Sequence, residues 1–152
     1  MLLACILLIV FAGSIYYNIN LMDAATQNMA LSSTTQLDRY CRNPDSSYCK
    51  ASATRINQIN DRIKNDLSSG LIMSGGVSSL TTDIQAPGSN TPASPPAGFN
   101  WTPGCGWGWA AITMKAPMTF FVSSDSDVAP SGDGLDYTSR ALGFTYSKGS
   151  SC

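Results

Sequence analysis

Histidine is absent from the chain, and only 12% of its 152 residues are charged. Without histidine, the chain lacks the usual general base, the commonest metal ligand, and every Ser-His or Cys-His nucleophile pair. The sequence also contains no glycine-rich phosphate loop and no nucleophile elbow. These absences argue against an enzyme, and we expect neither a cofactor nor a resident metal.

Positive charge is scarce as well. Nine Lys and Arg residues stand against ten acidic residues, and they are scattered instead of forming the basic stripe that neutralises phosphates. Direct nucleic-acid binding is therefore not expected. Since charged groups are few and Ser, Thr, Asn and Gly are abundant, neutral polar groups must cover the surface, which suits an exported protein.

Cysteine is infrequent as well, with five residues in the chain. Cys5 lies in an apolar run, and the other four lie in the polar part of the chain: Cys41, Cys49, Cys105 and Cys152. An even number predicts disulfides and an oxidising compartment. We pair 41 with 49 because a short loop with a Pro-Asp turn closes easily, and 105 with 152 because a terminal cysteine would pin a fraying tail. Sequence alone does not choose among the three possible connectivities, and C-x-x-C spacings that would favour zinc are absent.

The apolar residues concentrate in an uncharged N-terminal run, residues 1–22. Its strongly apolar part, up to Tyr17, would form a helix about 25 Å long, which is enough to span a bilayer if residues 18–22 continue it. No basic region precedes Leu2, and no small-x-small cleavage site directly follows the run. We therefore expect the segment to be retained and not removed as a signal peptide.

The apolar pattern becomes one-sided after this run. Ile15, Ile19, Met22 and Met29 recur at helical spacing, with polar residues between them. The sequence therefore predicts one helix over residues 1–37. Lipid or other copies of the same helix would surround its first half, and its second half would rest on its own domain.

The first half of this helix supplies the residues expected in a membrane or filament core. Gly13–Ser14, near its middle, favours either a kink or close packing against a neighbouring helix, and the sequence does not separate the two. The predicted membrane or polymerisation residues are Leu2, Leu3, Ile6, Leu7, Leu8, Ile9, Val10, Phe11, Ile15, Tyr16, Ile19 and Met22.

Residues 38–152 are predicted to form one small extracytoplasmic head domain. Isoleucines and leucines spaced three or four apart predict a second, amphipathic helix over Ser52–Leu67, antiparallel to the first and stopped by Gly70. Residues 68–104 are rich in Gly, Ser and Pro, and they predict an exposed loop region with at most a short strand or helix near 77–84.

The C-terminal third is typical of β-structure. We expect strands over Trp109–Lys115, Met118–Val122 and Leu135–Tyr146, separated by Ala116–Pro117 and by an acidic, Ser-rich turn over 123–134. The predicted fold class is α+β. A long N-terminal hydrophobic helix and a shorter amphipathic helix pack on a small antiparallel β-sheet, and disulfides stabilise the whole.

Two groups of residues are candidates for binding. The first is a set of acids that could supply oxygen ligands to calcium, but the spacing does not match the twelve-residue calcium loop, so a solvated turn is favoured. These acids are Asp125, Asp127, Asp133 and Asp136. The second is Trp101, Trp107 and Trp109, with glycines between them. They predict a carbohydrate or aromatic recognition patch or, more commonly, packing in the core and against a disulfide.

The order of these parts resembles a type IV pilin-like protein, and it is similar to TadE-like minor pilins of the tight-adherence systems. The segments that carry the resemblance are the apolar N-terminal helix, Ala111–Phe121 after a loop, and a last strand near Arg140–Phe144. The resemblance implies a structural subunit of an extracellular surface filament. It implies as partners further copies of the chain in a helical homopolymer, the inner membrane before assembly, and the pilus assembly machinery.

One position departs from the family pattern. Family members typically carry Glu at the fifth mature position, where it neutralises the N-terminal amine of a neighbouring subunit, and this chain has Cys5 there. A buried ammonium without a partner costs several kcal/mol. The first acid is Asp23, about 33 Å further along the helix, and cannot serve within one chain.

Two functions follow from the sequence. The first is a filament subunit that polymerises through its N-terminal helix. The alternative is a single-pass, membrane-anchored extracytoplasmic domain for binding or adhesion, with the Trp-Gly segment as its contact surface. Deletion of residues 1–22 would abolish assembly in the first case and spare binding in the second.

Overall fold

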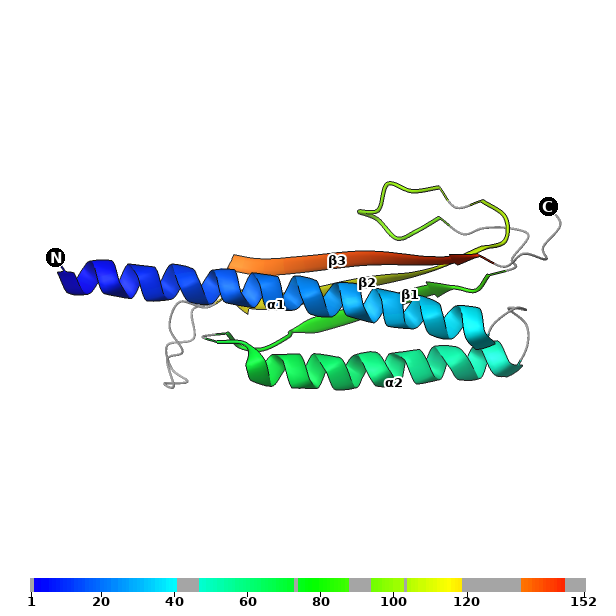
Figure 1. Ribbon diagram of the computed structural model, residues 1–152, viewed down its shortest axis with the longest axis horizontal. Coiled ribbons are helices and arrows are strands. Elements are labelled where there is room, and N and C mark those ends of the chain that lie inside the picture. Colours follow the sequence, from blue (N-terminus) through cyan, green and yellow to red (C-terminus); the bar gives the residue numbers. More distant parts are fainter. Residues whose placement is uncertain are drawn as a thin grey trace.

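The chain folds as two helices packed on a three-stranded sheet in the computed structural model, which describes residues 2–40, 47–72, 74–87, 94–102, 104–118 and 135–146. The two helices lie side by side and antiparallel on one face of the sheet (Figure 1). The elements are α1 (Leu2–Tyr40), α2 (Ser47–Gly70), β1 (Ser79–Gln85), β2 (Trp107–Met118) and β3 (Leu135–Tyr146). The α+β class, with a long N-terminal helix, a shorter helix and a small antiparallel sheet, is therefore confirmed.

Helix α1 is one continuous rod of 39 residues, three longer at its end than predicted. At 1.5 Å per residue it is about 58 Å long. The helix passes through Gly13–Ser14 without interruption, and the Ser14 hydroxyl donates to the Phe11 carbonyl at 2.8 Å. The helix therefore does not melt at this point. A Cβ at Gly13 would meet no atom within 4 Å, so close packing at this position needs a second molecule.

The buried stripe of α1 combines apolar and polar residues. Asn18, Met22, Thr26 and Met29 recur every three or four positions, and all are buried against the rest of the molecule. Thr26 is tolerated there because its hydroxyl donates to the Met22 carbonyl of its own helix at 2.7 Å. The buried stripe thus packs within the molecule, and the opposite face of α1 stays uncovered.

Strand β2 is the centre of the sheet, with β1 and β3 antiparallel on its two sides. The registers place Thr82 opposite Ile112 and Gly143 opposite Ala110. Strand alternation then turns one side of β2 toward the helices, where its side chains are almost completely buried. These inward residues are Ala110, Ile112, Met114, Ala116 and Met118.

The strand predictions were partly wrong. β2 continues through Ala116–Pro117, where the sequence suggested a break, because β1 pairs only as far as Lys115 and a missing N–H at Pro117 costs no β1–β2 hydrogen bond. The first strand is β1, which agrees with the short strand that the sequence allowed near 77–84 within the predicted loop region. Residues 119–122 of the predicted second strand lie outside the described residues. Helix α2 begins at Ser47, five residues before the predicted start, and ends at Gly70.

Strand β3 approaches α1 very closely at Gly143. A Cβ at this position would lie 2.7 Å from the Ala30 carbonyl oxygen and 2.9 Å from Cγ2 of Thr34. Glycine is therefore required here for space, because any side chain would push the helix off the sheet.

Candidate functional site

The N-terminal part of α1 exposes large apolar side chains on every side. Leu2 is 80% exposed and Ile9 is 70% exposed. Successive helical residues point about 100° apart, so a consecutive run of this kind surrounds the helix completely. The exposed apolar segment, as we call it below, comprises Leu2, Leu3, Ile6, Leu7, Leu8, Ile9 and Val10.

The other predicted core residues are placed differently by the structure. Tyr16 is exposed, whereas Phe11, Ile15 and Ile19 are half-buried. Met22 is completely buried in the molecule's own core between α1 and the sheet. Some of the predicted residues are therefore exposed in the single molecule and need lipid or another chain to cover them. The others are covered by the head of the same chain.

Asn18 ties the end of α2 to α1. Its Oδ1 accepts from the Ile72 amide at 2.9 Å, and its Nδ2 donates to the Ile72 carbonyl at 2.6 Å. The side chain is only 2% exposed, so water cannot reach its amide group. The two bonds to Ile72 supply the hydrogen-bond partners that the amide group needs. From Asn18 onward the head closes around α1 on the sheet side.

Asp23, the first charged residue, is turned toward the molecule's own sheet. Both of its carboxylate oxygens accept from the Tyr137 hydroxyl at 2.9 Å, and Oδ1 accepts from the Ser139 hydroxyl at 2.6 Å. Burial, followed by the hydrogen bond and the charge of Asp23, raises the pKa of Tyr137 above its usual value. The acid thus joins α1 to β3 and does not interrupt the apolar segment.

The helix that carries these features is apolar enough to cross a membrane. By length and composition, the stretch Leu2–Asp38 contains a window with a mean hydropathy of 2.2. A long apolar N-terminal helix of this kind could anchor the chain in a membrane. Cys5, a free and exposed thiol, lies within it.

The predicted disulfides remain predictions. Cys49 is buried and Cys105 is half-buried, and neither is a free thiol. Their predicted partners, Cys41 and Cys152, lie outside the described residues. The aspartates 125, 127 and 133 also lie outside them, and Asp136 is exposed on β3. Among the residues that the structure describes, no three His, Cys, Asp or Glu side chains gather as a metal site.

A second candidate site lies at the opposite end of the molecule, where β2 begins and β3 ends (Figure 1). Four aromatic side chains meet there, and we call them the aromatic cluster: Trp101, Trp107, Phe144 and Tyr146. The third predicted tryptophan, Trp109, lies opposite Phe144 on the same side of the sheet as Trp107, but it is only 4% exposed. Trp109 is thus packed away from water, and the recognition patch stays a prediction for the exposed rings. The contribution of β3 was missed because the pairing of Trp107 with Tyr146 becomes visible only with the register.

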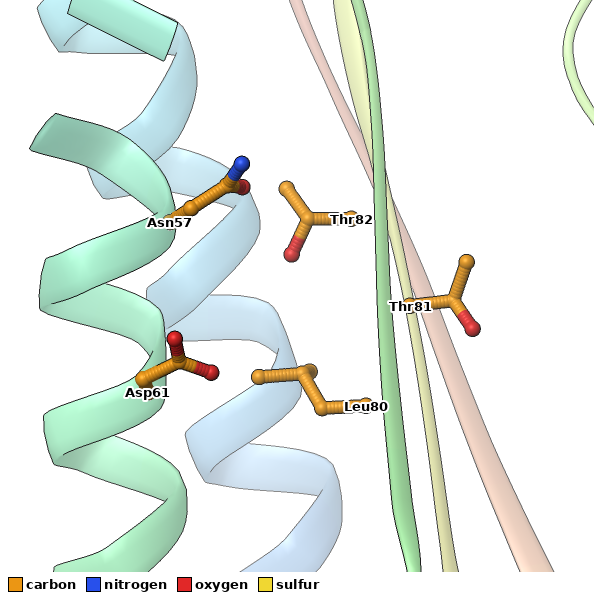
Figure 2. A pocket seen from close by; sticks show the side chains of 5 residues that line it. All are labelled: Asn57, Asp61, Leu80, Thr81 and Thr82. Atoms are coloured by element: carbon orange, nitrogen blue, oxygen red, sulfur yellow. The ribbon is translucent and has the colours of Figure 1, made fainter. Parts of the chain in front are cut away.

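A third candidate is an open groove between α2 and β1 with a volume of about 310 Å³. Asn57 and Asp61 line it from the helix, and Leu80 and Thr82 point toward them from the strand, while Thr81 points away (Figure 2). These lining residues include a single ionisable group, Asp61, so they contain no acid and base pair.

Beside this groove, Asn60 joins three elements. Its Nδ2 donates to the Ser33 hydroxyl of α1 and to the Thr82 hydroxyl of β1, both at 3.3 Å. Asn60 is 1% exposed, and its Oδ1 has no hydrogen-bond partner. The contact fixes α2 relative to the sheet edge, which makes it a structural element of the head.

Comparison of the chain with protein-family models, curated proteins and solved structures finds no match. The long apolar helix on a small antiparallel sheet is compatible with a pilin-like layout.

Proposed function

We propose that the protein is a structural subunit of an extracellular, type IV pilus-like filament and that it polymerises through the exposed apolar segment of α1. The observation that carries the proposal is the change along one unbroken helix. Its first turns expose apolar side chains on all sides, and from Asn18 onward it is buried on one side by its own head. A bundle of identical helices would cover the first part while leaving each head in water.

The free energy of burying the exposed apolar segment supports the proposal that other helices or lipid keep this segment out of water. Burial of one Leu, Ile or Val side chain stabilises by about 1.5–3 kcal/mol. Seven such side chains are exposed over Leu2–Val10. Together they provide a driving force comparable with the 5–15 kcal/mol that holds a typical domain folded, as an order of magnitude.

The absence of charge in the segment supports the same conclusion. Residues 2–22 carry no charged side chain, and Asp23 is hydrogen-bonded to β3. Packing of many copies therefore buries no unpaired side-chain charge within the apolar segment. In the proposed route, the subunit rests in the inner membrane before assembly and leaves it as the helix enters the filament core.

The test uses the full chain in detergent, with the detergent then removed by dialysis. Electron microscopy should show fibres of uniform diameter for the natural sequence. Ile9→Lys should prevent fibre formation, since it places a charge in the packed core. Because Ile9 is 70% exposed in the single molecule, the variant should keep the near-ultraviolet circular dichroism of the head.

Leu31→Lys is the matched control. Leu31 is an exposed aliphatic residue of the same helix, 63% exposed, but it lies in the half that packs on the head. Fibres should form with this variant. The proposal fails if the natural chain stays a monodisperse monomer, and a monomer that partitions into vesicles would favour the single-pass anchor instead. It also fails if Leu31→Lys blocks fibres as strongly as Ile9→Lys.

A further inference from the structure

The aromatic cluster leaves much of its ring surface in contact with water. Trp107 is 36% exposed, Phe144 is 48% exposed and Tyr146 is 50% exposed. Contiguous exposed apolar surface on a folded domain is uncommon unless it serves an interaction. The proposed filament contact does not account for this surface, because the cluster lies at the end of the sheet opposite the N-terminus (Figure 1).

Two strands and a loop hold the rings in place. The sheet register sets Trp107 directly opposite Tyr146, and Phe144 lies two residues earlier on the same face of β3. Trp101, from segment 94–102, contacts Phe144 with ring centroids 4.5 Å apart and Trp107 at 5.8 Å. The rings are therefore preorganised by the fold.

The segment that carries Trp101 is clamped on the sheet at a second point. Gly98 has φ +102°, a conformation that favours glycine, and a Cβ there would collide with the guanidinium of Arg140 on β3. The amide of Phe99 also donates to the Pro96 carbonyl at 3.3 Å, which closes a turn. Trp101 and Gly98 thus fix the segment across the sheet face away from the helices (Figure 1).

The chemistry of the cluster indicates the ligand class. The four rings and the residues beside Trp101, Asn100 and Thr102, carry no charge, and both of these polar side chains are exposed. The negative face of an aromatic ring attracts the partly positive C–H groups on the face of a pyranose. Neutral amide and hydroxyl groups beside such rings match a ligand that is rich in hydroxyl groups.

The position and shape of the cluster argue against a lipid surface. Phe144 follows Gly143, which packs on Ala30 of α1, about 42 Å of helix from Leu2, so one hydrocarbon core of about 30 Å could not cover both regions. The ring planes of Trp107 are inclined by 87° to Phe144 and by 52° to Tyr146. The surface is therefore ridged, with ring faces and edges presented in different directions, and it is not one flat apolar sheet.

We propose that the aromatic cluster is a binding site for a neutral carbohydrate, with Trp107, Phe144 and Tyr146 as its contact surface. The sugar ring packs on the exposed ring faces, and Trp101 supports Phe144 from the loop side. In a filament, each head would then display one such site. The proposal does not depend on polymerisation, because all of these residues belong to the head of a single chain.

The test titrates the full chain with four neutral oligosaccharides: maltoheptaose, cellohexaose, chitohexaose and a linear galactohexaose. The detergent must have no sugar headgroup, because a glucoside or maltoside would compete. Tryptophan fluorescence should change on addition of at least one of them, since Trp107 is exposed. The double variant Phe144→Ala, Tyr146→Ala should weaken that binding by at least about tenfold, because two ring contacts are lost.

Tyr48→Ala is the matched control, since Tyr48 is an exposed aromatic residue of α2 outside the cluster, 75% exposed. Its binding should equal that of the natural chain. Phe144→Leu keeps apolar volume but removes the ring, so it tests the contact in a variant with little risk to folding. Tyr146→Phe should bind the oligosaccharide nearly as well as the natural chain does, because the ring remains.

Three results would overturn the proposal. The first is no response to any of the four oligosaccharides. The second is equal binding by the natural chain and by Phe144→Leu. The third is a change in self-association on sedimentation, without a change in sugar binding, when the cluster is altered, which would make it a contact between copies of the chain. Loss of fibres in Ile9→Lys leaves this test unaffected.

Discussion

The link between Asp23 and β3 gives the sharpest prediction for the stability of the head. Asp23→Ala removes the acceptor for the hydroxyls of Tyr137 and Ser139, both on β3. A hydrogen bond to a charged group contributes about 1.5–3 kcal/mol, and a buried group that loses its partner costs about 1–3 kcal/mol. Ser139 is 2% exposed and has no access to water, whereas half-buried Tyr137 can turn toward solvent.

We therefore expect Asp23→Ala to lower the free energy of unfolding by about 2–4 kcal/mol. Asp23→Asn should lose about half as much, because its carbonyl oxygen still accepts. The assay is urea unfolding of the full chain in non-ionic detergent, followed by near-ultraviolet circular dichroism, with the midpoint compared at constant slope. Asp38→Ala, an exposed acid of the same helix, should change the free energy by less than about 0.5 kcal/mol.

The same contact predicts a specific response to alkaline pH. The pKa of Tyr137 is raised above the ordinary tyrosine value of 10.0, so the protonated phenol is favoured in the folded state. This contribution to stability is fully present below pH 10 and is lost as the pH rises through the higher folded pKa. Tyr137→Phe should not show this loss of stability between the unfolded and the folded pKa of the tyrosine. If the natural chain and Tyr137→Phe lose stability in parallel as the pH rises above 10, and Asp23→Ala behaves like Asp38→Ala, the reasoning is refuted.

Three further predictions concern packing and disulfides. Gly143→Ala should lower the free energy of unfolding by about 1–3 kcal/mol, because the new Cβ would lie 2.7 Å from the Ala30 carbonyl; an unchanged urea midpoint would contradict this contact. Ile112→Ala should cost about 2–5 kcal/mol in the same assay, since Ile112 is completely buried at the centre of the sheet; a loss below about 1 kcal/mol would place it outside the core. Mass spectrometry of the unreduced chain should detect linked peptides 41–49 and 105–152, and free thiols at these positions would contradict an oxidising compartment.

The sequence alone determined the helical framework and the class of the fold. The two helices follow from apolar spacing within consecutive residues, which is a local signal that needs no knowledge of distant segments. The uncharged N-terminal run and the C-terminal strand Leu135–Tyr146 were visible for the same reason. Strand β1 was only weakly indicated, because an edge strand with most of its residues half-buried shows little alternation between apolar and polar positions.

Only the tertiary structure decided which residues share a site. Asp23 is 114 and 116 positions from its two partners on β3, and no periodicity in the sequence connects them. The aromatic cluster likewise needs the β2–β3 register, which sets Trp107 opposite Tyr146 and Trp109 opposite Phe144. The close approach at Gly143 depends on the helix lying across that strand. Local spacing specifies which elements form, whereas the contacts between elements depend on side-chain volumes and hydrogen bonds that become defined only when distant segments meet.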